Sequence, residues 1–255
     1  MFKVLICIIA GIGAGVGTGF AGMSAAAVIS PMLIAFLDMD PYLAVGIALA
    51  SDVLASAASA VTYGKNKNLD IKNGLIMMAS VLCFTAVGSF VASVVPKTAM
   101  GNFSVIMTIL LGVKFIVKPV VAPKRRLTEA TTAQKAVRSV LCGSAVGFVC
   151  GFVGAGGGMM MLLVLTSVLG YELKTAVGTS VFIMSITALT GSVSHFVIGG
   201  MPDTEALIIC IVSTLAAAQL SAVFANKASP KTLNRITGAI LVALGIAVLV
   251  VNHVS

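Results

Sequence analysis

The chain has 255 residues, of which 59% are hydrophobic and only 9% are charged. A soluble domain carries roughly 25% charged residues, so eight acidic and sixteen basic side chains are too few to cover a water-soluble globule of this size. The composition therefore excludes a soluble enzyme, a disordered protein and a nucleic-acid-binding domain, and it predicts an all-α integral membrane protein.

Long apolar runs separated by short breaks predict about ten helices, five in each half of the chain. The expected helices are 4–21, 24–37, 42–63, 74–95 and 103–121, followed by 137–153, 157–169, 174–195, 204–225 and 232–252. Pro41, Pro96, Pro202 and Pro230 fall in the breaks, as expected of a residue that cannot continue a helix. A polar and basic linker at 122–136 separates the two sets.

The two sets of helices are predicted to be copies of one unit. Ala-Val-Gly-Ile-Ala at 44–48 matches Ala-Val-Gly-Thr-Ser at 176–180, and the glycine-rich stretch at 11–22 matches that at 147–158. We therefore expect a first membrane repeat at 1–121 and a second at 137–255, joined by the linker, as is common in secondary transporters. Because the first helix has a counterpart in the second half, we expect it to be retained rather than cleaved as a signal peptide.

The positions of Lys and Arg predict that the two repeats are inverted. Glycines interrupt the run 4–37 at Gly22 and its counterpart at Gly154 to Gly158. If 4–37 crossed the membrane once, the sixteen basic residues would divide 11 to 5 between the two sides; two short helices, re-entrant or spanning, give 14 to 2. Cytoplasmic loops collect Lys and Arg, so the second arrangement is favoured. This arrangement places both termini on the outer side of the cell membrane and the basic linker in the cytoplasm.

Interrupted helices also indicate where a substrate would bind. Helix amino ends expose N–H groups that favour anions, and glycine lets a ligand approach the backbone closely. The candidate substrate-binding residues are Gly22, Ser24, Ser51, Gly154, Gly156, Gly157, Gly158, Thr179 and Ser180. The alternative is that the glycines only let helices pack closely and that the hydroxyl groups bond to carbonyls of their own helix.

Two titratable side chains are candidates for proton coupling. Asp52 is the only acid well inside a predicted span, where it would act as a coupling or gating group or, alternatively, be a neutral side chain bonded between helices. Met184 occupies the equivalent position in the second half, so the halves are not chemically equivalent. His195 ends the predicted helix 174–195, and its imidazole could titrate near neutral pH or only anchor the helix at the interface.

No metal site or cofactor is expected. The five cysteines fall in apolar runs and show no CxxC spacing, which is typical of small buried side chains rather than of ligands. Met159 to Met161 could suggest a soft-metal site, but consecutive residues of a helix point in different directions. Packing is therefore the better explanation of these methionines.

The segment GFVCGFVGAGGGMMMLLVLTSVLGYELKTAVGTS at 147–180 resembles the signature of the sulfite exporter TauE/SafE permease family, and 17–52 looks like a diverged copy of it. The resemblance implies a secondary transporter, an exporter or permease of small sulfur-containing anions such as sulfite, sulfonates or sulfoacetate. Ile47 and Ala48 replace the hydroxyl-bearing residues of the signature, so more ligand contacts are expected from the second repeat.

We therefore expect a transporter of such an anion, coupled to protons, and not an enzyme. A passive anion channel and a permease for a small carboxylate or a soft metal ion remain as alternatives. The expected partners are the anionic substrate and membrane lipids, without nucleic acid, and a homodimer is left open.

Overall fold

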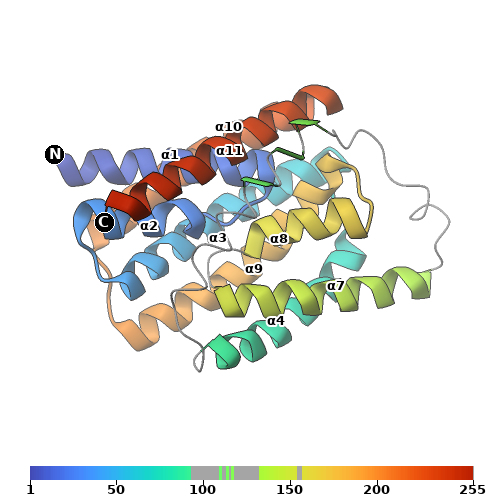
Figure 1. Cartoon of the computed structure of the whole chain (residues 1–255), viewed down its shortest axis with the longest axis horizontal. Helices are drawn as coiled ribbons and strands as arrows, with labels where there is room; N and C mark the ends of the chain where they lie inside the picture. Colours follow the sequence, from blue (N-terminus) through green and yellow to red (C-terminus); the bar gives the residue numbers. More distant parts are fainter. Residues whose placement is uncertain (93–108, 111–112, 115, 118–131, 154–156, 255) are drawn as a thin grey trace.

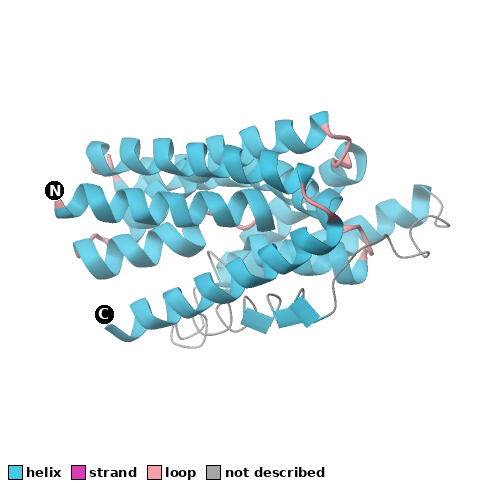
Figure 2. Cartoon of the chain, turned by 90° about the horizontal axis from the view of Figure 1, so that it is seen from above, coloured by secondary structure: helices cyan, strands magenta, loops and turns pink. Residues whose placement is uncertain are grey.

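The computed structural model describes residues 1–92, 109–110, 113–114, 116–117, 132–153 and 157–254. All regular structure in these ranges is helical (Figures 1 and 2). The helices of the first half are α1 (Phe2–Ala21), α2 (Ala26–Leu37), α3 (Pro41–Lys65) and α4 (Ile71–Ala92). Those of the second half are α7 (Thr132–Val153), α8 (Gly157–Leu163) with the π-helical segment η1 (Val164–Val168), α9 (Leu173–Gly199), α10 (Thr204–Lys227) and α11 (Pro230–Val254).

In the ranges that the structure describes, nine of the ten expected helices are present, with ends that differ by a few residues from the expected ones. The expected helix 103–121 lies largely outside the described residues. The helix expected at 157–169 changes from α to π geometry at Val164, so it is a short helix followed by one wider turn. α7 begins at Thr132, inside the segment expected as a linker.

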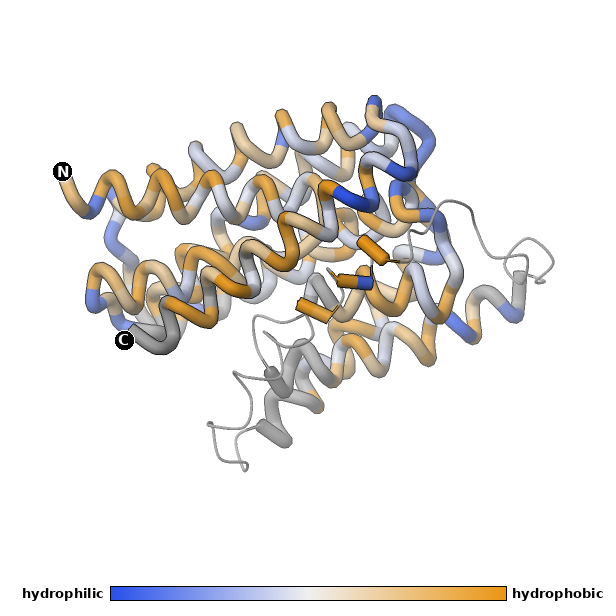
Figure 3. Tube along the Cα trace, turned by 45° about the horizontal axis from the view of Figure 1, so that its top comes forward, coloured by the Kyte–Doolittle hydropathy of each residue, from blue (hydrophilic) through white to orange (hydrophobic). Residues whose placement is uncertain are grey.

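Among the residues that the structure describes, four helices are long and apolar enough to cross a membrane, at Phe2–Ala21, Leu43–Lys65, Leu173–Val197 and Thr204–Lys227. Apolar side chains such as those of Leu5, Val61 and Val212 are more than half exposed on them. Figure 3 shows that hydrophobic residues follow the lengths of the helices, whereas hydrophilic residues gather near their ends. This distribution suits lipid around the bundle and water at its two ends.

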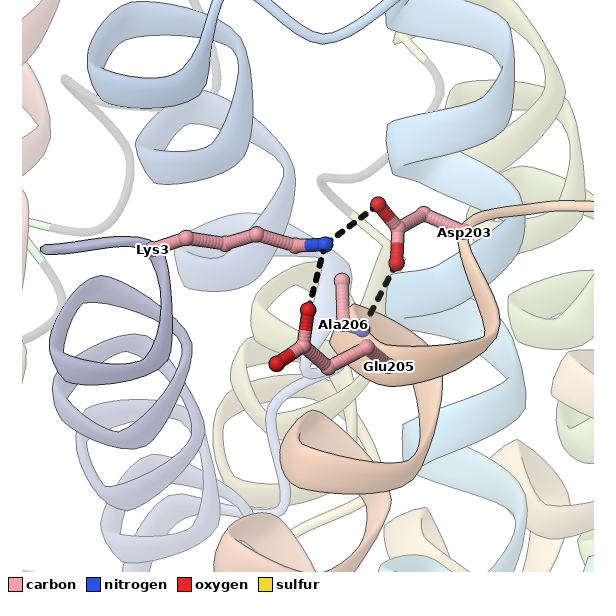
Figure 4. Close-up of polar contacts among 4 residues, drawn as sticks. All are labelled: Lys3, Asp203, Glu205 and Ala206. Atoms are coloured by element: carbon pink, nitrogen blue, oxygen red, sulfur yellow. Dashed lines mark hydrogen bonds and ion pairs between the residues drawn. The ribbon is translucent and has the colours of Figure 1, made fainter. Parts of the chain in front are cut away.

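α1 and α10 pack side by side and run parallel. Lys3, in the first turn of α1, pairs with Asp203 and Glu205 at the start of α10 (Figure 4). Near the other end, a Cβ atom on Gly19 would lie 2.5 Å from the Cβ of Ser221. Glycines at every fourth position of α1 therefore let the two backbones approach closely.

α7 and α4 also pack side by side, on the opposite side of the bundle from α1 and α10 (Figure 1). A Cβ atom on Gly143 would lie 2.7 Å from the carbonyl oxygen of Met77, and one on Gly147 would overlap that of Val81. This second pair also runs parallel. Gly143 and Gly147 follow Gly11 and Gly15 of α1 by 132 residues each, which is the offset between the matching segments 44–48 and 176–180.

α3 and α9 lie between these two helix pairs and pack against each other in antiparallel directions. A Cβ atom on Gly46 of α3 would lie 3.2 Å from the Cβ of His195, and one on Gly178 of α9 would lie 2.8 Å from the Cβ of Tyr63. Adding 132 to the number of Gly46 gives Gly178, and adding 132 to that of Tyr63 gives His195. Each contact is therefore the counterpart of the other at this sequence offset. The two ends of the chain lie at the same end of the bundle in both views (Figures 1 and 2).

Candidate functional site

The chain between α1 and α2 turns at Gly22. Gly22 has φ 60°, in the left-handed region, and its N–H donates to the carbonyl oxygen of Thr18 at 2.9 Å. Glycine adopts this conformation without a Cβ clash and commonly ends a helix in this way. Residues 22–25 then lead into α2, whose amino end is buried in the molecule.

The carbonyl oxygens around this break are bound by hydroxyl groups of the protein itself. The donors come from α1, α3, α9 and α11: Thr18 to Met23 at 3.0 Å, Tyr63 to Gly19 at 2.8 Å, Ser180 to Gly22 at 2.7 Å and Thr237 to Phe20 at 3.1 Å. These bonds satisfy acceptors that the end of a helix leaves without a partner. The hydroxyl of Ser180 therefore supports the break.

The amino end of α2 faces a carboxylate. Ser24 accepts a hydrogen bond from the N–H of Ala26 at 3.3 Å through its hydroxyl oxygen. That hydroxyl and the backbone N–H of Ala25 also lie beside the carboxylate of Asp52 on α3. The break thus places the positive end of a helix dipole next to the acid that lies inside a membrane-spanning helix.

Asp52 has an incomplete set of hydrogen bonds. Its side chain is 0% exposed, and its Oδ1 accepts a 2.7 Å bond from the hydroxyl of Ser56 one turn later. Its Oδ2 is buried and has no hydrogen-bond partner among the described residues. A buried polar atom without a partner is costly, so this oxygen marks a place where a proton or a ligand group would be stabilised.

The start of α8, directly after the second interruption, meets the first interruption. Gly154 and Gly156 lie outside the described residues, and Gly157 begins α8. A Cβ atom on Gly158 would lie 2.5 Å from the backbone nitrogen of Ser24 and 2.8 Å from the Cα of Met23. The start of α8 and the break after α1, far apart in the sequence, therefore touch through their backbones.

The other expected site residues lie apart from this contact. Thr179 accepts a hydrogen bond from the N–H of Asp70 at 3.2 Å, just before α4. Ser51 donates to the carbonyl oxygen of Ile47 on its own helix at 2.8 Å. His195 packs against Gly46. The structure thus brings together Gly22, Ser24, Asp52, Gly158 and Ser180.

Three residues of this region carried no expected role in the sequence. Ser56, Tyr63 and Thr237 bond to the acid or to the end of α1. The spacing of four residues between Asp52 and Ser56 could have indicated the first of these contacts. Nothing in the sequence pairs Thr237 with Phe20, 217 positions away. In the part of the chain that the structure describes, no group of three or more His, Cys, Asp or Glu side chains could hold a metal ion.

The sequence of the chain is similar to those of known proteins. The family described as sulfite exporter TauE/SafE matches residues 7–248. The chain is 25% identical to the probable membrane transporter protein YunE of Bacillus subtilis (strain 168), over 94% of this chain and 95% of that protein. It is 24% identical to the probable membrane transporter protein YdhB of the same organism, over 83% and 86% of the two chains. With its apolar helices, the chain is a multi-pass membrane protein and belongs to the sulfite exporter TauE/SafE family of membrane transporters.

Proposed function

We propose that the protein is a secondary transporter that carries a small sulfur-containing anion, such as sulfite, a sulfonate or sulfoacetate, together with protons. The observation that carries this proposal is the break at Gly22, where the amino end of α2 faces the buried carboxylate of Asp52. A helix amino end supplies the N–H groups and partial positive charge that an oxyanion needs. The class of anion comes from the family resemblance of residues 147–180.

The proposal includes two repeats of opposite orientation, with the linker in the cytoplasm and both termini outside. The antiparallel crossing of α3 and α9 supports it, because equivalent helices of inverted repeats must run in opposite directions. The reciprocal contacts of Gly46 with His195 and of Gly178 with Tyr63 are those that a two-fold axis would generate. Alternating access would then come from rocking of one repeat against the other.

The substrate would bind where the two breaks meet. Gly22, Ser24, Gly157 and Gly158 supply backbone groups there, and Gly154 and Gly156 belong to the same loop in the sequence. Gly158 packs against Ser24, so the breaks must separate to admit a ligand. Ser51, Thr179 and Ser180 would reach it only after exchanging their present bonds. Asp52 is the main coupling group, and His195 at the far end of α9 is the secondary one.

Counterflow in proteoliposomes tests this function. Vesicles loaded with unlabelled sulfite or an alkyl sulfonate should transiently accumulate the labelled anion from outside, because a carrier exchanges substrate. A passive channel would let label equilibrate without accumulation, and that result would replace the carrier by a channel. Loading with a small carboxylate or with Cu(I) distinguishes the other substrate classes. Accumulation with either of these and not with a sulfur oxyanion would overturn the proposed substrate.

A further inference from the structure

We infer that Asp52 is a tethered competitor of the substrate: its ionised carboxylate occupies the amino end of α2, and an anion binds there when Asp52 is protonated. The inference rests on the proposed function and adds the direction of its coupling. Proton binding and anion binding would favour each other, and both would move in the same direction across the membrane.

The geometry that supports this competition is local. The Asp52 carboxylate lies beside the Ser24 hydroxyl and the Ala25 N–H, which are the groups that an oxyanion at the amino end of α2 would use. Oδ2 of Asp52 is fully buried and accepts no hydrogen bond among the described residues. The carboxylate thus lies beside these donors and still leaves one of its oxygens without a partner among the described residues. A ligand that displaces the Asp52 carboxylate from these donors therefore does not have to break a complete set of hydrogen bonds.

Electrostatic repulsion determines that protonation of Asp52 favours anion binding. Two anions a few ångströms apart in a low-dielectric interior repel strongly, as they do when two buried carboxylates share one site and only one ionises. A sulfonate at the amino end of α2 would therefore bind poorly while Asp52 carries its charge. With one proton added, the same helix end would face a neutral acid and a single anion.

Few other groups can alter this balance. α1, α2, α9 and α10 pack against α3. The turn that leads into α2 presents the Ser24 hydroxyl and the Ala25 N–H to Asp52, and α3 itself presents the Ser56 hydroxyl. No titratable side chain of α1, α9 or α10 acts on the carboxylate among the described residues. Their charged residues Lys3, Lys174, Glu205 and Lys227 stand in the first or last helical turn, and His195 lies against Gly46, nearly two turns before Asp52.

The coupling has a simple charge balance. One monovalent sulfonate and one proton carry no net charge together, so each transport cycle would move no charge when the stoichiometry is one to one. A proton gradient would then drive the anion toward the side of higher pH. Flux of such an anion should respond to a pH difference and not to a membrane potential.

Binding of an alkyl sulfonate in detergent tests the inference, because the charge of this probe is constant between pH 5 and 8. Calorimetry would compare the wild type, Asp52→Asn, and Ser59→Ala as a control that removes a buried hydroxyl on the same helix. The dissociation constant of the wild type and of Ser59→Ala should rise by up to tenfold per pH unit once Asp52 ionises. Asp52→Asn should bind at least as tightly as the wild type at low pH, with the same constant at every pH.

Proton uptake by the wild type gives a second readout that needs no variant. In weak buffer containing a pH indicator, sulfonate binding should draw up to one proton per anion from solution at the higher pH values. Anion binding without proton uptake, or weaker binding by Asp52→Asn at all pH values, would overturn the competition while leaving the transporter proposal intact. If no sulfur oxyanion binds any of the three proteins at any pH, the proposed substrate fails and this inference fails with it.

Discussion

Gly158 and Ser24 lie in backbone contact: a Cβ atom on Gly158 would come within 2.5 Å of the Ser24 nitrogen. Gly158 is the second residue of α8, the helix that follows the second break, and Ser24 belongs to the first break. Only a residue without a side chain fits there, so this glycine is needed for contact between the start of α8 and the first break. The contact also means that any motion that admits a ligand must part these two residues.

Gly158→Ala should therefore disturb the centre of the protein although it adds a single methyl group. The methyl group must displace backbone at Met23 and Ser24 rather than a flexible side chain, and overpacking of this kind typically costs about 1–3 kcal/mol. We expect a lower melting temperature in detergent and loss of counterflow. Gly64→Ala is the control, because its nearest neighbour is the Leu69 Cδ2 at 3.3 Å, the end of a flexible side chain. A stable and active Gly158→Ala protein would show that the breaks need not touch.

Gly15→Ala and Gly147→Ala should destabilise the protein to a similar extent. A Cβ atom on Gly15 would overlap the carbonyl oxygen of Thr214, and one on Gly147 would overlap that of Val81. Each variant pushes apart a pair of closely packed parallel helices, so we expect a loss of about 1–3 kcal/mol in both cases. Thermal unfolding of the two purified variants measures this. A large loss in one and none in the other would contradict the equivalence of the α1–α10 and α4–α7 contacts.

The positions of the helices could be predicted because glycine and proline mark their ends and apolar runs mark their lengths. α3, for example, was expected at 42–63 and spans Pro41–Lys65. The role of each glycine was harder to assign. The break was expected at Gly22 and close helix packing was the alternative role of the glycines, and the stretch 11–22 serves both uses: Gly15 and Gly19 pack α1 against α10, whereas Gly22 has the left-handed conformation that ends the helix. Sequence spacing could not separate these uses, because both depend on which helix lies opposite.

The same limit applies to the candidate site. Asp52 could be singled out as an acid within an apolar run, but its place beside Ser24 could not be predicted from the sequence. The hydroxyls of Thr179 and Ser180 are adjacent in the sequence, yet one accepts from Asp70 and the other donates to Gly22. Neighbouring residues of a helix face different partners, so only the packing of α9 could assign them.

Asp203→Asn should lower stability slightly at neutral pH and make no difference in acid. The Asp203 carboxylate accepts a hydrogen bond from the Lys3 ammonium at 2.5 Å and one from the N–H of Ala206 at 3.1 Å, and these contacts hold the pKa of Asp203 below its usual range. Because the folded pKa is lowered, the stabilisation is fully present above about pH 4, the ordinary aspartate value, and disappears as the pH falls through the lower folded value. Melting temperatures of the wild type and variant between pH 7 and pH 2 measure the difference.

The size of this effect should be small, because the pair is partly exposed and exposed ion pairs contribute about 0–1 kcal/mol. Asparagine still caps a helix, so Asp203→Asn tests the ion pair with Lys3, whereas Asp203→Ala also removes the cap of α10. High salt should reduce the difference for the first variant and leave part of it for the second. A gap between wild type and Asp203→Asn that widens in acid would contradict the assigned sign.

Cysteines placed in the two equivalent loops test the orientation of the repeats directly. Lys65 ends α3 and Met201 precedes α10, and both side chains are exposed. In a cysteine-free background, a membrane-impermeant maleimide applied to intact cells should label Met201→Cys, whereas Lys65→Cys should react only after the membrane is opened. Inversion requires this difference because the two loops follow equivalent helices, α3 and α9, that run in opposite directions. Labelling of both positions from the same side would mean that the chain between them crosses the membrane an even number of times. The antiparallel crossing of α3 and α9 could not then relate two inverted repeats, and the two breaks would not form a site reached alternately from each side.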